Sequence, residues 1–198
     1  MNNNLYVSID VETTGTNPNK HQILEFAAIV DNIQDRNIIE LELLPVCHFR
    51  IHHSYIYGNP VAIAMNHKNI KAIADKDETK CKIIKKEDAA GKFKNFLEQC
   101  GMYKPDAPKR ENLISVAGKN FAGFDLLFLQ KLDFPMIFRS RILDPAILYH
   151  KPEEDGAILP DMQTCLDRAG IEKKVSHTAV DDAYDIIRLL KYKLYHSM

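Results

Sequence analysis

Leu5-Tyr-Val-Ser-Ile-Asp-Val-Glu-Thr-Thr-Gly15 is the stretch that decides the fold. Its apolar residues alternate with Tyr6, Ser8, Asp10 and Glu12, which predicts a β-strand with two distinct faces. Residues two apart in a strand point to the same face, so Asp10 and Glu12 project together. They lie at the carboxyl end of the strand, where ligands collect in open α/β sheets.

This pair of acids is the first indication of a metal site. Two neighbouring carboxylates repel each other unless a cation lies between them. Hard divalent cations such as Mg²⁺ and Mn²⁺ prefer oxygen ligands of this kind. Many strands end in two acids, however, so Asp10 and Glu12 alone indicate metal binding only weakly. Further ligands have to come from other parts of the chain.

The composition is that of one globular domain. The 198 residues suffice for a single core, and contents of 45% hydrophobic and 27% charged residues are ordinary. The sequence contains no apolar stretch of bilayer length and no secretory signal at its start. Widely spaced cysteines without a C-x-x-C pair are typical of reduced cytoplasmic thiols: Cys47, Cys81, Cys100 and Cys165. We therefore expect one cytoplasmic domain over residues 1–198, with no membrane contact.

Periodic segments along the chain predict an α/β fold. Apolar runs predict strands over residues 23–30 and 38–44, and residues 49–51 continue or follow the third strand. Capping and turn residues then delimit an alternation of further elements. We expect strands over 112–117 and within 135–143, and helices from 59, over 89–100, over 120–132, from 144, over 160–170 and over 179–195. This order predicts a mixed sheet flanked by helices.

The segment Ser176-His-Thr-Ala-Val-Asp-Asp182 precedes an amphipathic helix. Thr178 and Asp181 fit the S/T-x-x-D/E signature of a helix start. This signature places the N-terminus of the helix close to Ala179.

Helical spacing separates the two adjacent acids of this segment. Asp181 shares a face with Asp185 and should be exposed to water, whereas Asp182 shares a face with Ile186 and should point toward the sheet. An inward-pointing acid in the first helical turn needs a partner, and a metal ion would be one. His177 lies just before the helix, in a loop rather than in the core stripe.

A third segment, Gly118-Lys-Asn-Phe-Ala-Gly-Phe-Asp-Leu-Leu-Phe-Leu129, contains Asp125 as the single acid of an apolar helix. This helix begins where a strand ends, the kind of junction that also carries the other acids. A capping interaction or a buried salt bridge would account for Asp125 as well. An unpaired acid at this place would be costly, so Asp125 is a fourth candidate ligand.

Together these segments resemble the DEDDh (DnaQ-like) exonucleases, a family that includes proofreading subunits of DNA polymerases, ribonuclease T and oligoribonuclease. The family's D-x-E-T-T-G, N-x-x-x-[F/Q]-D and H-x-A-x-x-D motifs are matched, in order, at residues 10–15, 120–125 and 177–182. The resemblance implies a ribonuclease H-like α/β fold, with a mixed β-sheet flanked by α-helices. The long segment over residues 45–110 departs from the family pattern, so binding details carry over poorly there.

The resemblance implies a metal-dependent 3′→5′ exonuclease that releases nucleoside 5′-monophosphates from single-stranded DNA or RNA. Two Mg²⁺ or Mn²⁺ ions would be held by Asp10, Glu12, Asp125 and Asp182. His177 would be the general base, because imidazole changes its charge near neutral pH. The 3′-terminal nucleotide would contact residues of the first two motifs: Thr13, Thr14, Gly15, Asn120 and Phe124.

The expected partner is a nucleic acid with a free 3′ end. The net charge of −1 does not indicate such a partner, but bound cations would supply positive charge at the site itself. Residues 68–94 hold nine lysines and five acids, which form either a solvated face or a groove wall for the phosphate backbone. A proofreading role would require a polymerase bound non-covalently, and a homodimer is a second assembly left open.

A rival function is a module that binds nucleic acid or a protein partner without chemistry. The presence of all five chemical residues argues against it.

Three further features allow more than one interpretation. Glu25, in an apolar strand near the first motif, either supports the metal ligands or is a paired structural acid. Cys47-His48 and His52-His53 cluster as zinc ligands do, although strand alternation already accounts for a polar face there. Tyr55 and Tyr57 either stack on bases or, the simpler interpretation, pack against the protein.

Overall fold

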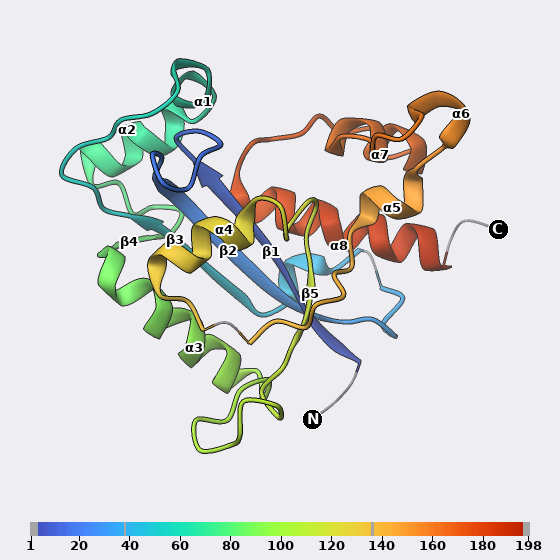
Figure 1. Ribbon diagram of the computed structural model, residues 1–198, viewed down its shortest axis with the longest axis horizontal. Helices are drawn as coiled ribbons and strands as arrows, with labels where there is room; N and C mark the ends of the chain where they lie inside the picture. The colour runs from blue at the N-terminus through green and yellow to red at the C-terminus, as the bar shows by residue number, and fades with distance from the viewer. Residues whose placement is uncertain (1–3, 38, 136, 196–198) are drawn as a thin grey trace.

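The computed structural model describes residues 4–37, 39–135 and 137–195, which contain a five-stranded sheet (Figure 1). The strands are β1 (Leu5–Thr13), β2 (Ile23–Asn32), β3 (Val46–Ile51), β4 (Lys82–Ile84) and β5 (Ser115–Ala117). Their order in the sheet is β4-β3-β2-β1-β5. β2 runs antiparallel to both β1 and β3, while β5 joins β1 and β4 joins β3 in parallel. The predicted mixed sheet is confirmed.

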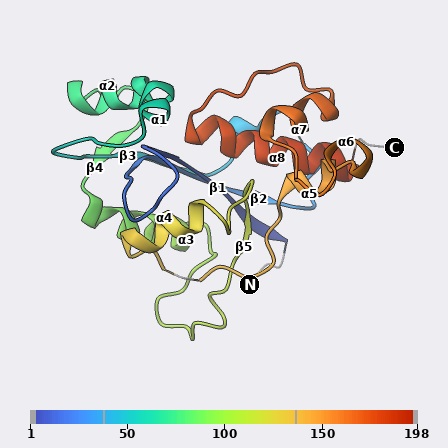
Figure 2. The ribbon, with the colours of Figure 1, turned by 45° about the horizontal axis from the view of Figure 1, so that its top comes forward.

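Helices cover both faces of the sheet, with α8 on one side and α3 and α4 on the other (Figure 2). The α-helices are α1 (Pro60–Met65), α2 (His67–Asp75), α3 (Ala89–Gln99), α4 (Asp125–Leu129), α5 (Pro145–Tyr149), α6 (Pro152–Asp155), α7 (Met162–Ala169) and α8 (Ala179–Tyr195). Short 3₁₀ helices are η1 (Leu41–Leu43), η2 (Lys86–Asp88) and η3 (Gln130–Leu132). Among the described residues, none of these helices combines the length and the apolar character needed to cross a bilayer.

β1 lies between two neighbours in the sheet and is buried on both faces. Val7 and Ile9 point into the larger core, which they share with residues of α3 and α4. Tyr6 points to the opposite face and packs beneath α8. Because side chains alternate along a strand, Asp10 and Glu12 follow Tyr6 on the face that carries α8.

Buried polar contacts fix α8 to this face at both of its ends. Near the N-terminus, the Ser8 hydroxyl donates to the carbonyl oxygen of Ala183 at 2.8 Å. Near the C-terminus, the Lys191 ammonium lies 3.1 Å from the Asp31 carboxylate, and both side chains are fully buried. The Tyr6 hydroxyl donates to the same carboxylate at 2.6 Å. The Ser8 bond holds the start of α8 against β1, and the Lys191 pair holds its far end against β2.

The helix starts predicted from capping residues are confirmed. Side-chain caps close the first turns of α1, α5 and α7: Asn59, Asp144 and Asp161. The long C-terminal helix begins at Ala179, as predicted. Thr178 Oγ1 donates to the Asp181 carboxylate at 2.8 Å just at this start.

The strand predicted over residues 38–44 is wrong in position. Residue 38 lies outside the described residues, and residues 41–43 form η1. Ile39 and Leu43 are 85% and 78% exposed, whereas Leu41 inserts beneath α8, so the three alternating residues do not share one buried face. The third strand comes after Pro45, as β3, and includes the predicted residues 49–51.

Two elements near the second motif are shorter than predicted. The helix expected over residues 120–132 begins only at Asp125, because Asn120 has a left-handed backbone (φ 56°) and turns follow it. The strand expected within residues 135–143 is reduced, in its described part, to two isolated bridges. These bridges pair Ile114 with Phe138 and Ala117 with Leu143.

Candidate active site

Four acidic side chains from distant parts of the chain converge at the end of β1. Asp10 and Glu12 lie on β1, Asp125 begins α4, and Asp182 lies in the first turn of α8. Burial raises the pKa of Asp10 well above its ordinary value, and the charges of Asp125, Asp182 and Glu12 raise it further. The structure thus brings together the four acids proposed as metal ligands.

His177 joins this acidic cluster from the loop that precedes α8. One ring nitrogen of His177 and one carboxylate oxygen each of Glu12 and Asp182 lie within 4.8 Å of one another. His177 is exposed, and its backbone is left-handed with φ of 53°. Non-glycine residues seldom adopt this conformation, and it recurs at functional sites. The imidazole is therefore placed between the acids and solvent.

Burial makes these acids difficult to ionise. It raises the pKa of Glu12 from 4.5 to about 7, although a hydrogen bond from Asn66 lowers it in part. Burial also raises the pKa of Asp125 and of Asp182, and the charge of Asp185 adds to the effect at Asp182. A bound cation would stabilise the charged forms, so this cluster has the chemistry of a divalent-cation site.

Asp125 is tied directly to the strand that carries the other acids. It is 2% exposed, and its Oδ1 accepts a hydrogen bond from the backbone N–H of Val11 at 3.1 Å. Because Val11 lies between Asp10 and Glu12, this bond sets the start of α4 against both of them.

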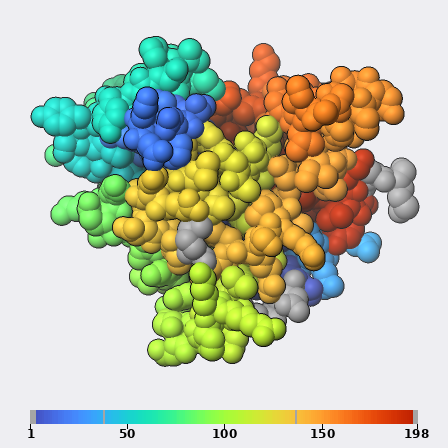
Figure 3. Space-filling model, viewed as in Figure 1, coloured from blue at the N-terminus to red at the C-terminus, as the bar shows by residue number. Residues whose placement is uncertain are grey.

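The turn Thr13-Thr14-Gly15 borders the acidic cluster. Thr14 is fully buried, and both its N–H and its hydroxyl oxygen bond to the backbone of Gln22 at 2.9 Å. Gly15 has φ of 153°, and a Cβ there would lie 2.5 Å from the His21 ring, so only glycine fits. At the surface the loop that follows this turn, over residues 16–20 (blue), lies between the α1–α2 segment (teal) and the segment that contains α4 (yellow), as Figure 3 shows.

Asn120 and Phe124 lie on the turn that leads into α4. Asn120 is exposed, and its backbone N–H donates to the Asp144 carboxylate at 2.8 Å. Phe124 is half-buried, and its ring centroid lies 5.1 Å from that of Phe128. Both side chains are accessible to a ligand beside Asp125.

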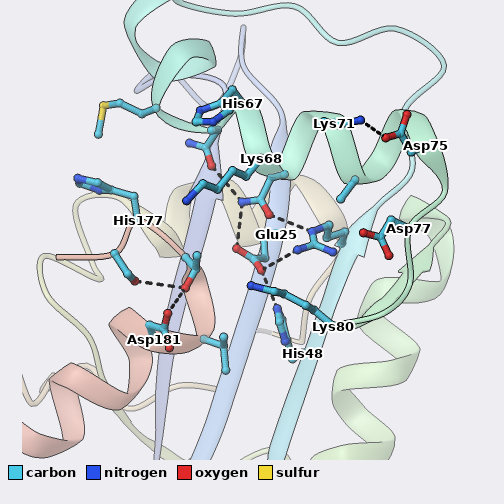
Figure 4. Close-up of a pocket in the computed structure, with 18 residues that line it drawn as sticks. Glu25, His48, His67, Lys68, Lys71, Asp75, Asp77, Lys80, His177 and Asp181 are labelled. Carbon is cyan, nitrogen blue, oxygen red and sulfur yellow. Dashed lines mark hydrogen bonds and ion pairs between the residues drawn. The ribbon is translucent and has the colours of Figure 1, made fainter. Parts of the chain in front are cut away.

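A groove of about 470 Å³ runs alongside His177 (Figure 4). Its walls are the segment leading into α8, on one side, and α2 with the loop that follows, on the other. Lys68 and Lys80 line this groove, whereas Lys82 is exposed and pairs with Glu78 at 2.7 Å. The lysine-rich segment therefore contributes both a groove wall and a solvated surface.

Two buried asparagines belong to this site and were not predicted from the sequence. Asn66 Nδ2 donates to Glu12 Oε2 at 2.9 Å and to the Thr13 carbonyl at 3.2 Å. Asn69 Nδ2 donates to Asn66 Oδ1 at 3.1 Å and to Glu25 Oε2 at 3.0 Å. The local signal is two amides three residues apart at the start of a helix, which is also typical of an exposed helix face.

Glu25 is a paired buried acid, with 1% of its surface exposed. His48 Nε2 lies 2.7 Å from Glu25 Oε1, and the backbone N–H of Ala179 donates to Oε2 at 3.0 Å. Burial opposes ionisation of Glu25, but the hydrogen bonds from His48, Ala179 and Asn69 together lower its pKa.

The two His-containing pairs do not form a common zinc site. Cys47 points into the core beneath α3, whereas His48 lies on the opposite face of β3. A different trio, His48 with Glu25 and Cys81, is close enough to hold a metal ion. The Arg50 guanidinium, 4.0 Å from Glu25, makes a cation unfavourable there.

Tyr55 and Tyr57 are 83% and 59% exposed, so neither packs in the core. The Gln22 side chain bonds to the backbone of both at 3.0 Å, which holds their loop beside Thr14. Packing in the core, one form of the simpler interpretation, is therefore wrong, and base stacking stays the untested alternative.

The face of α8 expected to be exposed is buried at its centre. Asp182 is 7% exposed and turned inward, as helical spacing predicts, and Asp181 is half-buried. Asp185, however, is fully buried and pairs with Lys173 at 2.7 Å and Arg188 at 2.8 Å. The expectation of a wet face was wrong because the segment before α8 folds back and delivers Lys173 to it.

A family model described as RNase_T, Exonuclease, matches the chain over residues 7–190. The chain belongs to this exonuclease family. The prediction of an exonuclease related to the DEDDh enzymes is thereby confirmed. The search of curated protein sequences found no match to this chain.

Solved structures of other exonucleases share its fold. E. coli Exonuclease I in complex with a dT13 oligonucleotide is 18% identical to this chain with a TM-score of 0.62, and the match covers 94% of this chain and 40% of that chain. A zinc-bound complex of the same E. coli enzyme with single-stranded DNA is 17% identical with a TM-score of 0.65. This match covers 98% of this chain and 41% of that chain. The nuclease domain of 3′hExo, a DEDDh family member bound to rAMP, is 14% identical with a TM-score of 0.67. This match covers 99% of this chain and 94% of that chain. This chain thus spans about two fifths of the length of the E. coli enzyme, and the predicted ribonuclease H-like fold is confirmed.

Proposed function

We propose that this exonuclease removes nucleoside 5′-monophosphates from the 3′ end of single-stranded DNA or RNA in a metal-dependent reaction. The observation that carries the proposal is the convergence of four buried or half-buried acids with His177 at the end of β1. The cluster contains residues of β1 and of α8, which lie at opposite ends of the sequence and pack together. This supports residues 1–198 as a single exonuclease domain.

The donor set suits two Mg²⁺ or Mn²⁺ ions, because it consists of carboxylate oxygens. Asp10 would be shared by both ions, Glu12 and Asp182 would complete the ligands of one, and Asp125 would serve the other. When bound, the ions would help to generate the nucleophile, orient the phosphate and stabilise the charge on the leaving oxygen.

His177 would accept the proton of the attacking water. Its ring lies beside the carboxylates of Glu12 and Asp182, and it is exposed, so the proton can pass from the imidazole to solvent. The new bond joins the water oxygen to phosphorus. The bond that breaks joins phosphorus to the 3′ oxygen of the preceding nucleotide.

The terminal nucleotide would lie against the turn at Thr13-Thr14-Gly15, with Asn120 and Phe124 across from it. The rigid backbone of this turn and the accessibility of both side chains support that placement. Two solved relatives hold an oligonucleotide and a nucleotide, respectively, which supports a nucleic-acid substrate.

Incubation with 5′-labelled single-stranded DNA and RNA oligomers of matched sequence tests the proposal. A ladder of shortened products that requires Mg²⁺ or Mn²⁺ is expected, and relative rates on the two oligomers identify the preferred sugar. Full activity in excess EDTA would contradict the metal mechanism. A shifted but intact band would indicate a binding module instead.

A further inference from the structure

An unbroken row of buried hydrogen bonds connects Glu12 with the start of α8. Its middle members, Asn66 and Asn69, are 4% and 3% exposed. Each amide uses both N–H groups and its oxygen. Asn66 donates twice to β1 and accepts from Asn69, and Asn69 also donates to Glu25 and accepts from Arg50 Nε at 2.9 Å.

The charged neighbours determine how the two amides are turned. The oxygen of Asn69 must face the Arg50 guanidinium, which only donates, and its NH₂ must face the Glu25 carboxylate, which only accepts. The same reasoning turns the NH₂ of Asn66 toward Glu12. A buried polar network with every member satisfied is rigid and directional.

Glu25 is the point at which this row meets α8. Its Oε2 accepts from the Asn69 amide and from the N–H of Ala179, each at 3.0 Å, and Ala179 is the first residue of the helix. A carboxylate there satisfies a free N–H and is favoured by the helix dipole. His177 and Asp182 flank Ala179, so this bond ties the segment that carries both of them to β2.

The second oxygen of Glu25 is held by basic side chains on β3. His48 Nε2 lies 2.7 Å and the Arg50 guanidinium 4.0 Å from Oε1. Figure 4 shows Glu25 between His48 and the residues of α2, in the groove that His177 also lines. Glu25 is therefore held from three elements at once.

We propose that Glu25 is a positioning residue of the active site. Through Asn69 and Asn66 it orients Glu12, and through Ala179 it holds the segment with His177 and Asp182. The ligands on β1 and α8 thereby keep the separation that a divalent cation needs. This inference rests on the proposed function, since it concerns the same metal ligands.

The variant Glu25→Gln tests the proposal, because an amide cannot accept all the hydrogen bonds that the carboxylate accepts. We expect the Mn²⁺ affinity, measured by calorimetry without nucleic acid, and kcat on a labelled oligomer each to fall by about 10- to 100-fold. The KM for the oligomer should change by less than about threefold, since Glu25 does not contact the substrate.

Asp31→Asn is the matched control. Asp31 is a buried acid on the same face of β2, but it pairs with Lys191 at the far end of the strand. This variant should lower the melting temperature while leaving Mn²⁺ affinity and kcat of the folded protein unchanged. All assays are run below the melting temperature of each variant.

Asn69→Ala breaks the row between Glu25 and Asn66 without removing a charge. It should lower Mn²⁺ affinity in the same sense as E25Q. The double variant should lose little more than the larger single loss, because both changes interrupt one route. If the losses of Mn²⁺ affinity in the two single variants multiply in the double variant, this row of hydrogen bonds is not the connection between Glu25 and Glu12.

The outcomes separate this inference from the proposed function. If wild type cleaves, and E25Q melts earlier but binds Mn²⁺ and cleaves as D31N does, Glu25 is only structural and the proposed function stands. If wild type neither binds Mn²⁺ nor cleaves, both are overturned.

Discussion

His177 differs from the acids around it in being exposed, so it adds little to the packing of the core. His177→Ala should therefore lower kcat by about 10²- to 10⁴-fold, the contribution of general base catalysis, with almost no change in melting temperature. His67, also exposed and on the same groove, is the matched control, and His67→Ala should leave kcat nearly unchanged. Equal losses for both variants would show that the groove, rather than the base, is affected.

Asp10 is surrounded by acids that disfavour its charged form. Asp10→Asn should abolish turnover, yet at pH 8 and without metal it should melt at the same temperature as wild type or higher, because a repulsive charge is removed. Activity assays and calorimetry on one preparation test both parts. A variant that loses activity because it unfolds would contradict this account.

The raised pKa of Glu12 predicts how stability depends on pH and metal. Folding moves this pKa from 4.5 to about 7, so the folded protein binds the proton more tightly than the unfolded chain does. Metal-free protein should lose this stabilisation as pH rises from about 4.5 through about 7. Mn²⁺ competes with the proton, so it should raise the melting temperature more at pH 8 than at pH 6. Equal increases at both pH values, measured against EDTA, would contradict the prediction.

Between elements, the loop before α1 is fitted closely to the turn after β1. A Cβ on Gly58 would lie 2.1 Å from the carbonyl oxygen of Thr14, which also accepts the N–H of Asn59 at 2.8 Å. Gly58→Ala should cost about 1–3 kcal/mol of unfolding free energy and raise the KM for oligonucleotide, because the loop must move away. Gly91→Ala, in α3 with open space around it, should instead stabilise by about 0.5–1 kcal/mol.

The far end of α8 depends on one buried ion pair. Lys191 and Asp31 are both fully buried, and Lys191 also donates to the Asp35 carbonyl at 2.8 Å. Lys191→Ala should lower the unfolding free energy by about 3–5 kcal/mol, because it leaves an uncompensated buried carboxylate. Exposed Lys193 is the control, and Lys193→Ala should cost less than about 1 kcal/mol in denaturant titrations.

Elements with a strong local pattern could be predicted from the sequence, and those without one could not. α8 is long and amphipathic, so its phase distinguishes Asp182 from Asp181. Residues 38–44 also alternate, but alternation does not reveal that Ile39 and Leu43 face water. Burial there is decided by how the chain returns to the sheet, which is a tertiary effect.

In the molecule as a whole, the site combines motif residues with partners that no motif marks. Asn66 bonds to Glu12 across 54 positions of sequence, and Asn69 bonds to Glu25 across 44. Neither contact has a local signature in the sequence, because the partner of each asparagine side chain is brought next to it only by the fold. The convergence of the four acids with His177 could be predicted from spacing and resemblance, whereas the contacts of Asn66, Asn69 and Glu25 required the fold.

The contact between Ser8 and Ala183 joins positions 175 residues apart and brings the first strand and the last helix to one place. During translation β1 leaves the ribosome long before α8 is made. A nascent chain ending before residue 177 lacks His177 and Asp182, and it cannot cover the face of β1 on which Asp10 and Glu12 lie. The acidic cluster therefore stays incomplete during synthesis until the α8 segment has left the ribosome and packed against β1.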